Sequence, residues 1–362
     1  MSARIIFSPI LPLIEDEFMI RHARASSIFM FLSMGYAVSL SFAGFYSGRF
    51  GYKRSIALSL LTTSFVLFLI SFTKVFSAFY VSAFILGFAG GIYIPSVIPL
   101  ITEYFAQNRW SKSITIHDTA ASISIFSLPL IILFFLQFCT WRGVFVLFAL
   151  FFLISALIFY SISEEVKTRH SEKMRLGSLF KTQSLWAFII IWVFAAGANT
   201  GLYSIVPLYL TKELSLSIQY ANSILGTSRL GGIGVAVLCT FLVDRFNLRR
   251  IIFVMLFLGG IFTVLTAVAP VRFIGFALFF QAIFVTGFFP LSFVAITKMF
   301  RKEITGMTTG MILAISVIFG GGLVPYFLGL SGDLLSFRFG ISLLGIFLSL
   351  SSLLMFTLKE LR

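Results

Sequence analysis

Long apolar stretches separated by short polar segments dominate the hydrophobic pattern of this sequence. An α-helix needs about 20 apolar residues to cross a hydrocarbon core of about 30 Å. Eleven stretches reach that length, at residues 26–48, 54–73, 77–103, 113–138, 143–162, 185–210, 219–243, 250–269, 273–297, 305–330 and 336–357. The pattern therefore predicts an all-α protein that crosses a membrane many times.

The composition agrees with a membrane location. Hydrophobic residues make up 59% of the 362 residues and charged residues 11%, whereas a soluble domain carries about 25% charged residues. The net charge of +14 comes from Lys and Arg in short clusters between the spans, so no continuous basic face for a nucleic acid is predicted. We expect a monomer that contacts membrane lipids and a small-molecule substrate, with no cofactor, metal or nucleic acid.

The loops at the two ends of the predicted spans differ in their basic residues. Of the 27 Lys and Arg residues, 18 lie at one end and 7 at the other, while Arg4 and Arg229 lie inside spans. Cytoplasmic loops carry the excess of positive charge. We therefore predict that the end with 18 is cytoplasmic, in a bacterial-type inner membrane, and that both termini of the complete protein lie on that side.

The two halves of the chain repeat each other. Three pairs of residues share nearly one offset: Pro12 with Pro207 (207 − 12 = 195), Pro95 with Pro290 (290 − 95 = 195), and Gly48 with Asp244 (244 − 48 = 196). The longest polar stretch lies between the halves. We predict an N-terminal six-helix bundle at 1–162, a cytoplasmic linker at 163–184 and a C-terminal six-helix bundle at 185–362.

The first predicted helix is shorter than its counterpart in the second half. Ser2 to Ile14 covers only some 20 Å at about 1.5 Å per residue. Arg4 has three residues before it, whereas its counterpart Asn199 (199 − 4 = 195) has fourteen span residues before it. We therefore expect that the first of twelve spans is truncated at its N-terminus, by 14 − 3 = 11 residues.

The loop between the second and third spans reads Gly44-Phe45-Tyr46-Ser47-Gly48-Arg49-Phe50-Gly51-Tyr52-Lys53-Arg54. It resembles the G-x-x-x-D-R-x-G-R-[KR] loop of the major facilitator superfamily. The residues that match are Gly44, Arg49, Gly51, Lys53 and Arg54, while Gly48 replaces the aspartate of that family. The copy in the second half keeps the aspartate but lacks both glycines, and its charged residues are Asp244, Arg245, Arg249 and Arg250.

The resemblance implies a twelve-helix fold of two parallel repeats and a secondary transporter that works by alternating access. In relatives, the aspartate of this loop helps to hold the cytoplasmic side shut. Here Asp244 is expected to do so, at the N-terminal turn of span 5, where an anion meets free N–H groups. The alternative is that both basic loops only set the membrane orientation.

Two arginines lie deep inside the predicted spans. By helical rise, Arg4 lies about 16 Å and Arg229 about 15 Å from the periplasmic ends of their spans, so both are expected near the midplane, in different halves. A guanidinium group binds carboxylate, phosphate or nitrate through two parallel N–H donors, and no acidic residue is predicted in the same layer. Asn199, at the repeat position of Arg4, adds an amide.

Members of the family that carry monocarboxylates, oxalate or nitrate use midplane arginines, in the eighth span among other places. The resemblance therefore implies that Arg4, Arg229 and Asn199 bind a small organic or inorganic anion in a central cavity. The alternative is that Arg4 snorkels to the membrane surface or packs against carbonyls near a helix break at Pro9 and Pro12, and that Arg229 has a similar structural role.

His117 and Asp118 lie near the cytoplasmic end of span 5. A proton-coupled symporter needs a group that titrates near neutral pH, and histidine or a buried aspartate can do so. These two residues are therefore the candidates for proton coupling. The alternative is that they cap the first turn of span 5.

Other functional classes lack their required residues. An intramembrane enzyme would need paired carboxylates, a metal-binding cluster or a Ser–His pair within the spans, and only His117 and Asp118 come near that, so no enzyme is expected. A duplicated chain also lacks the repeated pore motif of a channel. The rival hypothesis is an exporter of neutral or cationic amphiphiles.

Overall fold

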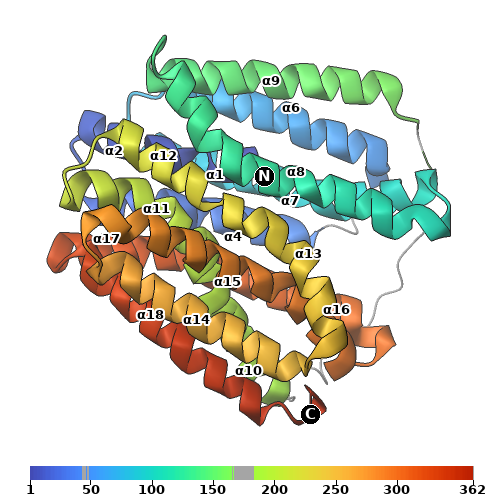
Figure 1. Ribbon diagram of the computed structural model, residues 1–362. Coiled ribbons are helices and arrows are strands. Elements are labelled where there is room, and N and C mark those ends of the chain that lie inside the picture. Colours follow the sequence, from blue (N-terminus) through green and yellow to red (C-terminus); the bar gives the residue numbers. More distant parts are fainter. Residues whose placement is uncertain (43–45, 47–48, 165, 167–182, 362) are drawn as a thin grey trace.

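Long helices lie side by side in the computed structural model, and the chain reverses direction between them at the two ends of the bundle (Figure 1). The structure describes residues 1–42, 46, 49–164, 166 and 183–361, without the side chains at 111, 236–238, 240–244, 302 and 303. Within this part, ten helices are long and apolar enough to cross a membrane. The predicted all-α membrane fold is confirmed.

The helices of the N-terminal half begin and end within a few residues of the predicted spans, except that the second span starts earlier and ends earlier. They are α1 (Ser2–Ile5), α2 (Phe7–Phe18), α3 (His22–Ser26), α4 (Ile28–Ser41), α6 (Tyr52–Ser71), α7 (Ser77–Tyr104), α8 (Trp110–Phe135) and α9 (Trp141–Ile162).

The helices of the C-terminal half are interrupted more often. Three of them begin with a side-chain cap, from Ser217, Asn247 and Ser336, whose oxygens accept N–H groups of the first turn. The α-helices are α10 (Gln183–Ala196), α11 (Leu202–Leu208), α12 (Ile218–Ser228), α13 (Leu230–Arg245), α14 (Leu248–Val268), α15 (Val271–Met299), α16 (Lys302–Ser316), α17 (Val324–Leu334) and α18 (Phe337–Ser352).

The eighth span, predicted at 219–243, is formed by two consecutive helices. The break lies at Arg229, between α12 and α13. There the backbone forms i→i−3 hydrogen bonds. The Arg229 N–H donates to the Gly226 carbonyl at 2.9 Å, and the Arg229 carbonyl accepts from the Gly232 N–H at 3.1 Å. A short 3₁₀ step of this kind often marks a functional site.

Two π-helical turns face each other in the seventh and eleventh spans. They are η3 (Gly197–Gly201) and η5 (Val317–Leu323). A Cβ atom added at Gly201 would lie 2.7 Å from the Gly320 carbonyl oxygen, and one added at Gly320 would lie 2.5 Å from that of Val193. Only glycine permits this approach, so the glycines bring the two irregular turns into contact.

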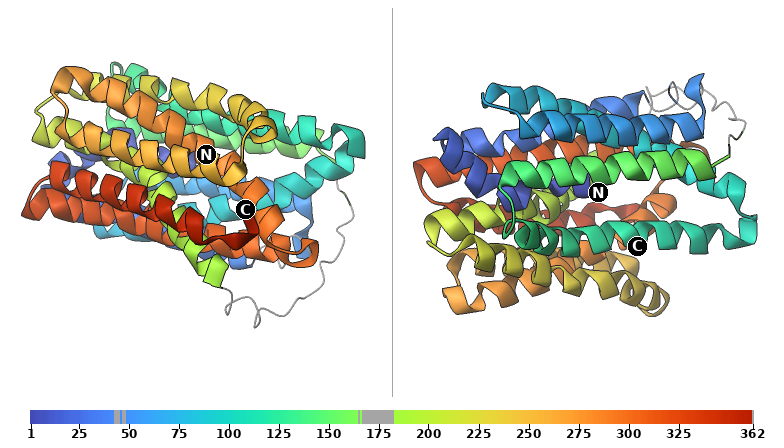
Figure 2. Two further views of the ribbon diagram at one scale, coloured as in Figure 1. Left: turned by 60° about the horizontal axis from the view of Figure 1, so that its bottom comes forward. Right: turned by 90° about the horizontal axis from the view of Figure 1, so that it is seen from above.

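The two halves lie largely one above the other in Figure 1, the N-terminal half from blue to green and the C-terminal half from yellow-green to red. They pack across their boundary through α2 with α11, α3 with α17, and α8 with α12. Figure 2 shows the same bundle from two other sides. We call the end at which α9 ends and α10 begins the linker face, and the other end the opposite face.

Candidate functional site

Arg229 points into the bundle from the break in the eighth span and is only 5% exposed. Its Nη1 donates to Asn199 Oδ1 at 3.0 Å, and its Nη2 to the Asn199 carbonyl oxygen at 3.3 Å. The guanidinium carbon also lies 4.9 Å from the centroid of the Tyr203 ring. Within the described part of the chain, Nε is buried without a hydrogen-bond partner. The structure thus brings Arg229 and Asn199 together.

The π-helical turn η3 explains why the Asn199 carbonyl can accept from an arginine. Such a turn interrupts the regular hydrogen bonding of a helix and leaves carbonyl groups that need other partners. The neighbouring Ala198 carbonyl accepts from Gln281 Nε2 at 2.8 Å, and Gln281 is fully buried on α15. Sequence reasoning missed Gln281, although a lone amide inside an apolar span was a signal.

Replacement of Gln281 by leucine is expected to destabilise the protein by about 1 kcal/mol, because the Ala198 carbonyl then loses its partner in an apolar layer. The measurement is the thermal unfolding midpoint in detergent. Thr297→Ala is the matched control on the same helix, since that exposed hydroxyl bonds only to the Val294 carbonyl of its own turn. Equal midpoints for both variants would contradict this role of Gln281.

Arg4 packs against an aromatic ring as well. Its guanidinium carbon lies 4.1 Å from the centroid of the Tyr36 ring. Gly90 on α7 borders this pair, and a Cβ atom there would make ordinary van der Waals contact, 3.8 Å from Tyr36 Cδ2 and 3.9 Å from Arg4 Cγ. The described residues offer this guanidinium neither a hydrogen bond nor a carboxylate, and its Nε is buried. Cation–π contact lowers the cost of a charge at this depth without neutralising it.

Short contacts connect the surroundings of the two arginines. Ser33 lies one helical turn before Tyr36 on α4. A Cβ atom at Gly321 in η5 would lie 3.4 Å from Ser33 Oγ and 3.5 Å from Thr200 Oγ1, and Thr200 directly follows Asn199. The surroundings of the two arginines therefore approach each other at Gly321 of η5. We call Arg4, Tyr36, Ser33, Thr200, Asn199 and Arg229 together the arginine layer.

Tyr203 links this layer to the other half of the chain. Its hydroxyl donates to the Ile125 carbonyl of α8 at 3.2 Å, and its own carbonyl accepts from Ser8 Oγ at 2.7 Å. Ser8 and Tyr203 are 195 residues apart, which is the repeat offset seen in the sequence. That offset was the available signal for a residue that sequence reasoning missed.

His117 and Asp118 lie on α8 and turn to different surroundings. The His117 ring stacks on Tyr93 with centroids 5.8 Å apart, and its Nε2 lies 3.2 Å from the Tyr93 hydroxyl. Its Nδ1 lies 3.2 Å from Asp118 Oδ1, while the Asp118 side chain is 67% exposed. His117 therefore faces α7, and Asp118 faces away from the packed interior.

Polar contacts between the halves close the opposite face. Asp333 of α17 accepts the backbone N–H groups of the first two residues of α3, each at 2.9 Å. Lys212 pairs with Asp16 and lies 3.8 Å from Glu15, whose other oxygen is 2.9 Å from His22 Nδ1. These groups belong to the first, second, seventh and eleventh spans and tie them together.

The linker ends of the helices on either side of the boundary are unpacked. Ile116 on α8 is 64% exposed. A Cβ atom added at Gly306 or Gly310 on α16 would meet no atom within 4 Å. These positions at the linker face are unpacked, whereas polar contacts hold the two halves together at the opposite face.

The two basic loops bind the ends of neighbouring helices in equivalent ways. Lys53 Nζ donates to the Ser163 carbonyl at 2.5 Å and lies 4.6 Å from the centroid of the Tyr160 ring. Arg249 Nη2 donates to the Phe356 carbonyl at 3.1 Å and stacks over the Phe356 ring. The residues correspond by the repeat (249 − 53 = 196; 356 − 160 = 196). Each cation thus neutralises a helix C-terminus.

The two basic loops also carry four arginines at the surface of the protein. Arg49, Arg54, Arg245 and Arg250 are exposed. Gly44 and the Asp244 side chain lie outside the described residues, so the contact expected between Asp244 and span 5 stays a prediction.

Gly51 begins α6 with a backbone φ of 78° and ψ of 166°, a region that is essentially restricted to glycine. Gly51→Ala is expected to cost about 1–3 kcal/mol of stability. The yield of monodisperse protein and its unfolding midpoint measure this effect. Gly306→Ala is the matched control, because its Cβ meets open space in a regular helix. A Gly51→Ala variant as stable as the control would refute the requirement.

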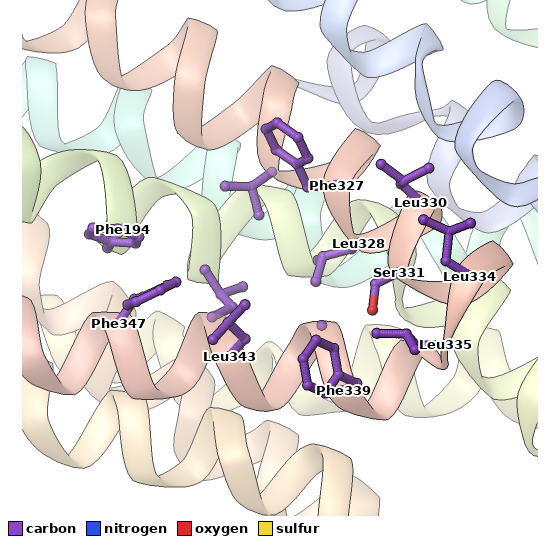
Figure 3. A pocket seen from close by; sticks show the side chains of 13 residues that line it. Phe194, Phe327, Leu328, Leu330, Ser331, Leu334, Leu335, Phe339, Leu343 and Phe347 are labelled. Carbon is purple, nitrogen blue, oxygen red and sulfur yellow. The ribbon is translucent and has the colours of Figure 1, made fainter.

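An apolar cavity of about 380 Å³ lies entirely within the C-terminal half. Figure 3 shows its side chains, contributed by α10, α17 and α18, with the Ser331 hydroxyl as the polar atom among the labelled residues. Neither Arg4 nor Arg229 lines it. It is therefore separate from the arginine layer.

Comparisons with known proteins agree with this architecture. The family model of the Major Facilitator Superfamily matches residues 1–270 and also 194–361. The chain belongs to the major facilitator superfamily. The family predicted from the loop motif is thus confirmed, and the chain is a multi-pass membrane transporter. A comparison with curated proteins gave no match.

Several solved structures share the fold. A bacterial homologue of the human lysosomal transporter Spinster, in an inward-facing and unoccupied conformation, is 14% identical, with a TM-score of 0.82 over 99% of this chain and 94% of that one. The D-xylose–proton symporter is 16% identical, with a TM-score of 0.80 over 100% and 95%. A variant of the nucleoside transporter NupG is 12% identical, with a TM-score of 0.82 over 99% and 97%.

Proposed function

We propose that this superfamily member is a secondary active transporter of a small organic or inorganic anion. The anion binds in the layer of Arg4 and Arg229, and the two halves, taken as bundles at 1–162 and 185–362, rock around it. We place the linker face in the cytoplasm of an inner membrane, which makes an inward-open assignment for this structure part of the proposal.

The observation that carries this proposal is the pair of unneutralised guanidinium groups. Each packs on a tyrosine ring, each has a buried Nε without a partner, and neither pairs with a carboxylate among the described residues. A charge inside a membrane costs at least a few kcal/mol, so such groups usually serve function. A bound anion would neutralise both.

Proton coupling is the second part of the proposal and rests on His117. Its ring contacts Tyr93 on α7 and Asp118 on α8, and the Asp118 side chain is exposed. A histidine in this position can exchange a proton with water on the open side. We therefore propose an anion–proton symporter.

Uptake into proteoliposomes tests both parts. Labelled nitrate, oxalate and a monocarboxylate serve as anions, with a neutral sugar and a cationic amphiphile as controls, each at two external pH values. We expect uptake of at least one anion, faster with an inward proton gradient. Uptake of the amphiphile alone would overturn the anion proposal, and anion uptake that ignores the gradient would overturn only the coupling.

One observation favours the rival hypothesis of an amphiphile exporter. The cavity in Figure 3 offers an almost wholly apolar surface that would suit an amphiphile. Because both of its walls belong to the C-terminal half, rocking of the halves would not expose it alternately to the two sides. The arginine layer therefore has the stronger claim.

A further inference from the structure

A groove at the opposite face lies between helices of the two halves and carries two arginines. It has a volume of about 670 Å³, with α3 and α4 on one side and α17 on the other. Arg21 and Arg24 are exposed, and neither forms an ion pair within the described part of the chain. Asp333 also lines the groove, but both its oxygens accept N–H groups of His22 and Ala23.

The groove changes in character with depth. From Arg21 to Phe31 the wall of α3 and α4 extends about 15 Å at about 1.5 Å per residue. The two arginines line the groove at the end of the helices near the opposite face, and Met30, Phe31 and Leu330 line it further along α4 and α17. Tyr326 lines the groove as well, and its hydroxyl has no hydrogen-bond partner among the described residues. The groove is therefore amphipathic along the membrane normal.

A lipid phosphate matches this arrangement. Arginine binds phosphate oxygens through parallel N–H donors, and the apolar depth suits a hydrocarbon chain. We propose that the groove binds one phospholipid, with its phosphate between Arg21 and Arg24 and an acyl chain against Met30, Phe31 and Leu330. A free anion would leave the apolar part unfilled.

The position of the groove between the two halves determines what a bound lipid would do. One wall belongs to the N-terminal half and the other to the C-terminal half, and Asp333 already joins them. A phospholipid that bridges these walls holds the opposite face closed. The site is independent of the transported substrate.

Native mass spectrometry of delipidated protein with phosphatidylglycerol tests this site. The double variant Arg21→Gln, Arg24→Gln is expected to retain the lipid roughly tenfold less than wild type, because two phosphate contacts are lost. The double variant Lys74→Gln, Arg272→Gln removes two exposed charges of the same face and should retain it fully. Equal retention by the two double variants would overturn the proposal.

A second variant separates the lipid from other anions. Leu330→Trp fills the apolar depth but leaves both arginines in place, so it should lose phosphatidylglycerol too. A diacylglycerol with a sugar headgroup should not bind to wild type, and millimolar inorganic phosphate should not displace the phospholipid. Displacement by phosphate would show a free-anion site. Full retention by Leu330→Trp would show that no acyl chain lies against Leu330. Either result would overturn the lipid assignment. Size-exclusion chromatography checks that each variant is folded.

Discussion

Replacement of Arg229 by lysine is expected to weaken uptake of the anionic substrate roughly tenfold to a hundredfold, although the positive charge is kept. Arg229 holds the Asn199 side chain and carbonyl with two separate N–H groups. An ammonium group cannot reproduce this planar fork, and charge-assisted hydrogen bonds contribute about 1.5–3 kcal/mol each. Arg229→Ala should abolish uptake.

Arg272→Lys is the matched control, because Arg272 is exposed near the opposite face and stacks over Phe273. It should transport like wild type. Initial uptake rates over a range of substrate concentrations measure both variants, after size-exclusion chromatography has shown each to be folded. Wild-type anion uptake by Arg229→Ala would refute the role of Arg229 and leave the amphiphile exporter as the better account.

Replacement of Asp333 by asparagine is expected to open the opposite face. The carboxylate accepts the N–H groups of both His22 and Ala23 across the boundary between the halves, where its charge also meets the positive end of a helix. The amide of asparagine keeps one acceptor oxygen for one backbone N–H, but its NH2 group faces the other backbone N–H and cannot accept from it. The loss of about 1–2 kcal/mol shifts the ratio of closed to open molecules roughly tenfold.

Pulsed electron paramagnetic resonance can follow this shift with spin labels at Phe72 and Leu335, two exposed positions at the opposite face in different halves. Cys139 and Cys239, both free thiols, are replaced by serine in every variant. Glu213→Gln is the control, because Glu213 accepts the Phe337 N–H within one half. If both variants give the wild-type distance distribution, Asp333 does not hold the face shut.

The spans and the family could be predicted because both depend on short stretches of chain. The predicted span at 77–103 is the helix Ser77–Tyr104, and that at 250–269 is Leu248–Val268. Each apolar stretch meets lipid or other apolar helices wherever it lies, so its length alone decides whether it can cross. The loop motif between the second and third spans is equally local.

The arrangement around Arg229 could be predicted only in part. Helical rise and the repeat placed Arg229 and Asn199 at similar depth. The direct contact between them depends on the π-helical turn at 197–201, which frees the Asn199 carbonyl. That turn packs against another turn more than a hundred residues away through Gly201 and Gly320. The hydrophobic periodicity within one span does not predict such packing.

By itself, the sequence determined a polytopic helical protein with arginines inside its spans, because apolar length and buried charge are properties of each segment alone. The resemblance of one loop to a family motif added the expectation of a transporter. The tertiary structure decided which face is closed, which partners the arginines take, and that Tyr203 and Gln281 belong to their surroundings. Those outcomes depend on hydrogen bonds between helices far apart in the chain, such as Ser8 with Tyr203 and Asp333 with His22. The free energy of these two bonds is gained only when the two halves meet, and that of Arg229 with Asn199 and Gln281 with Ala198 only when the helices of the C-terminal half pack.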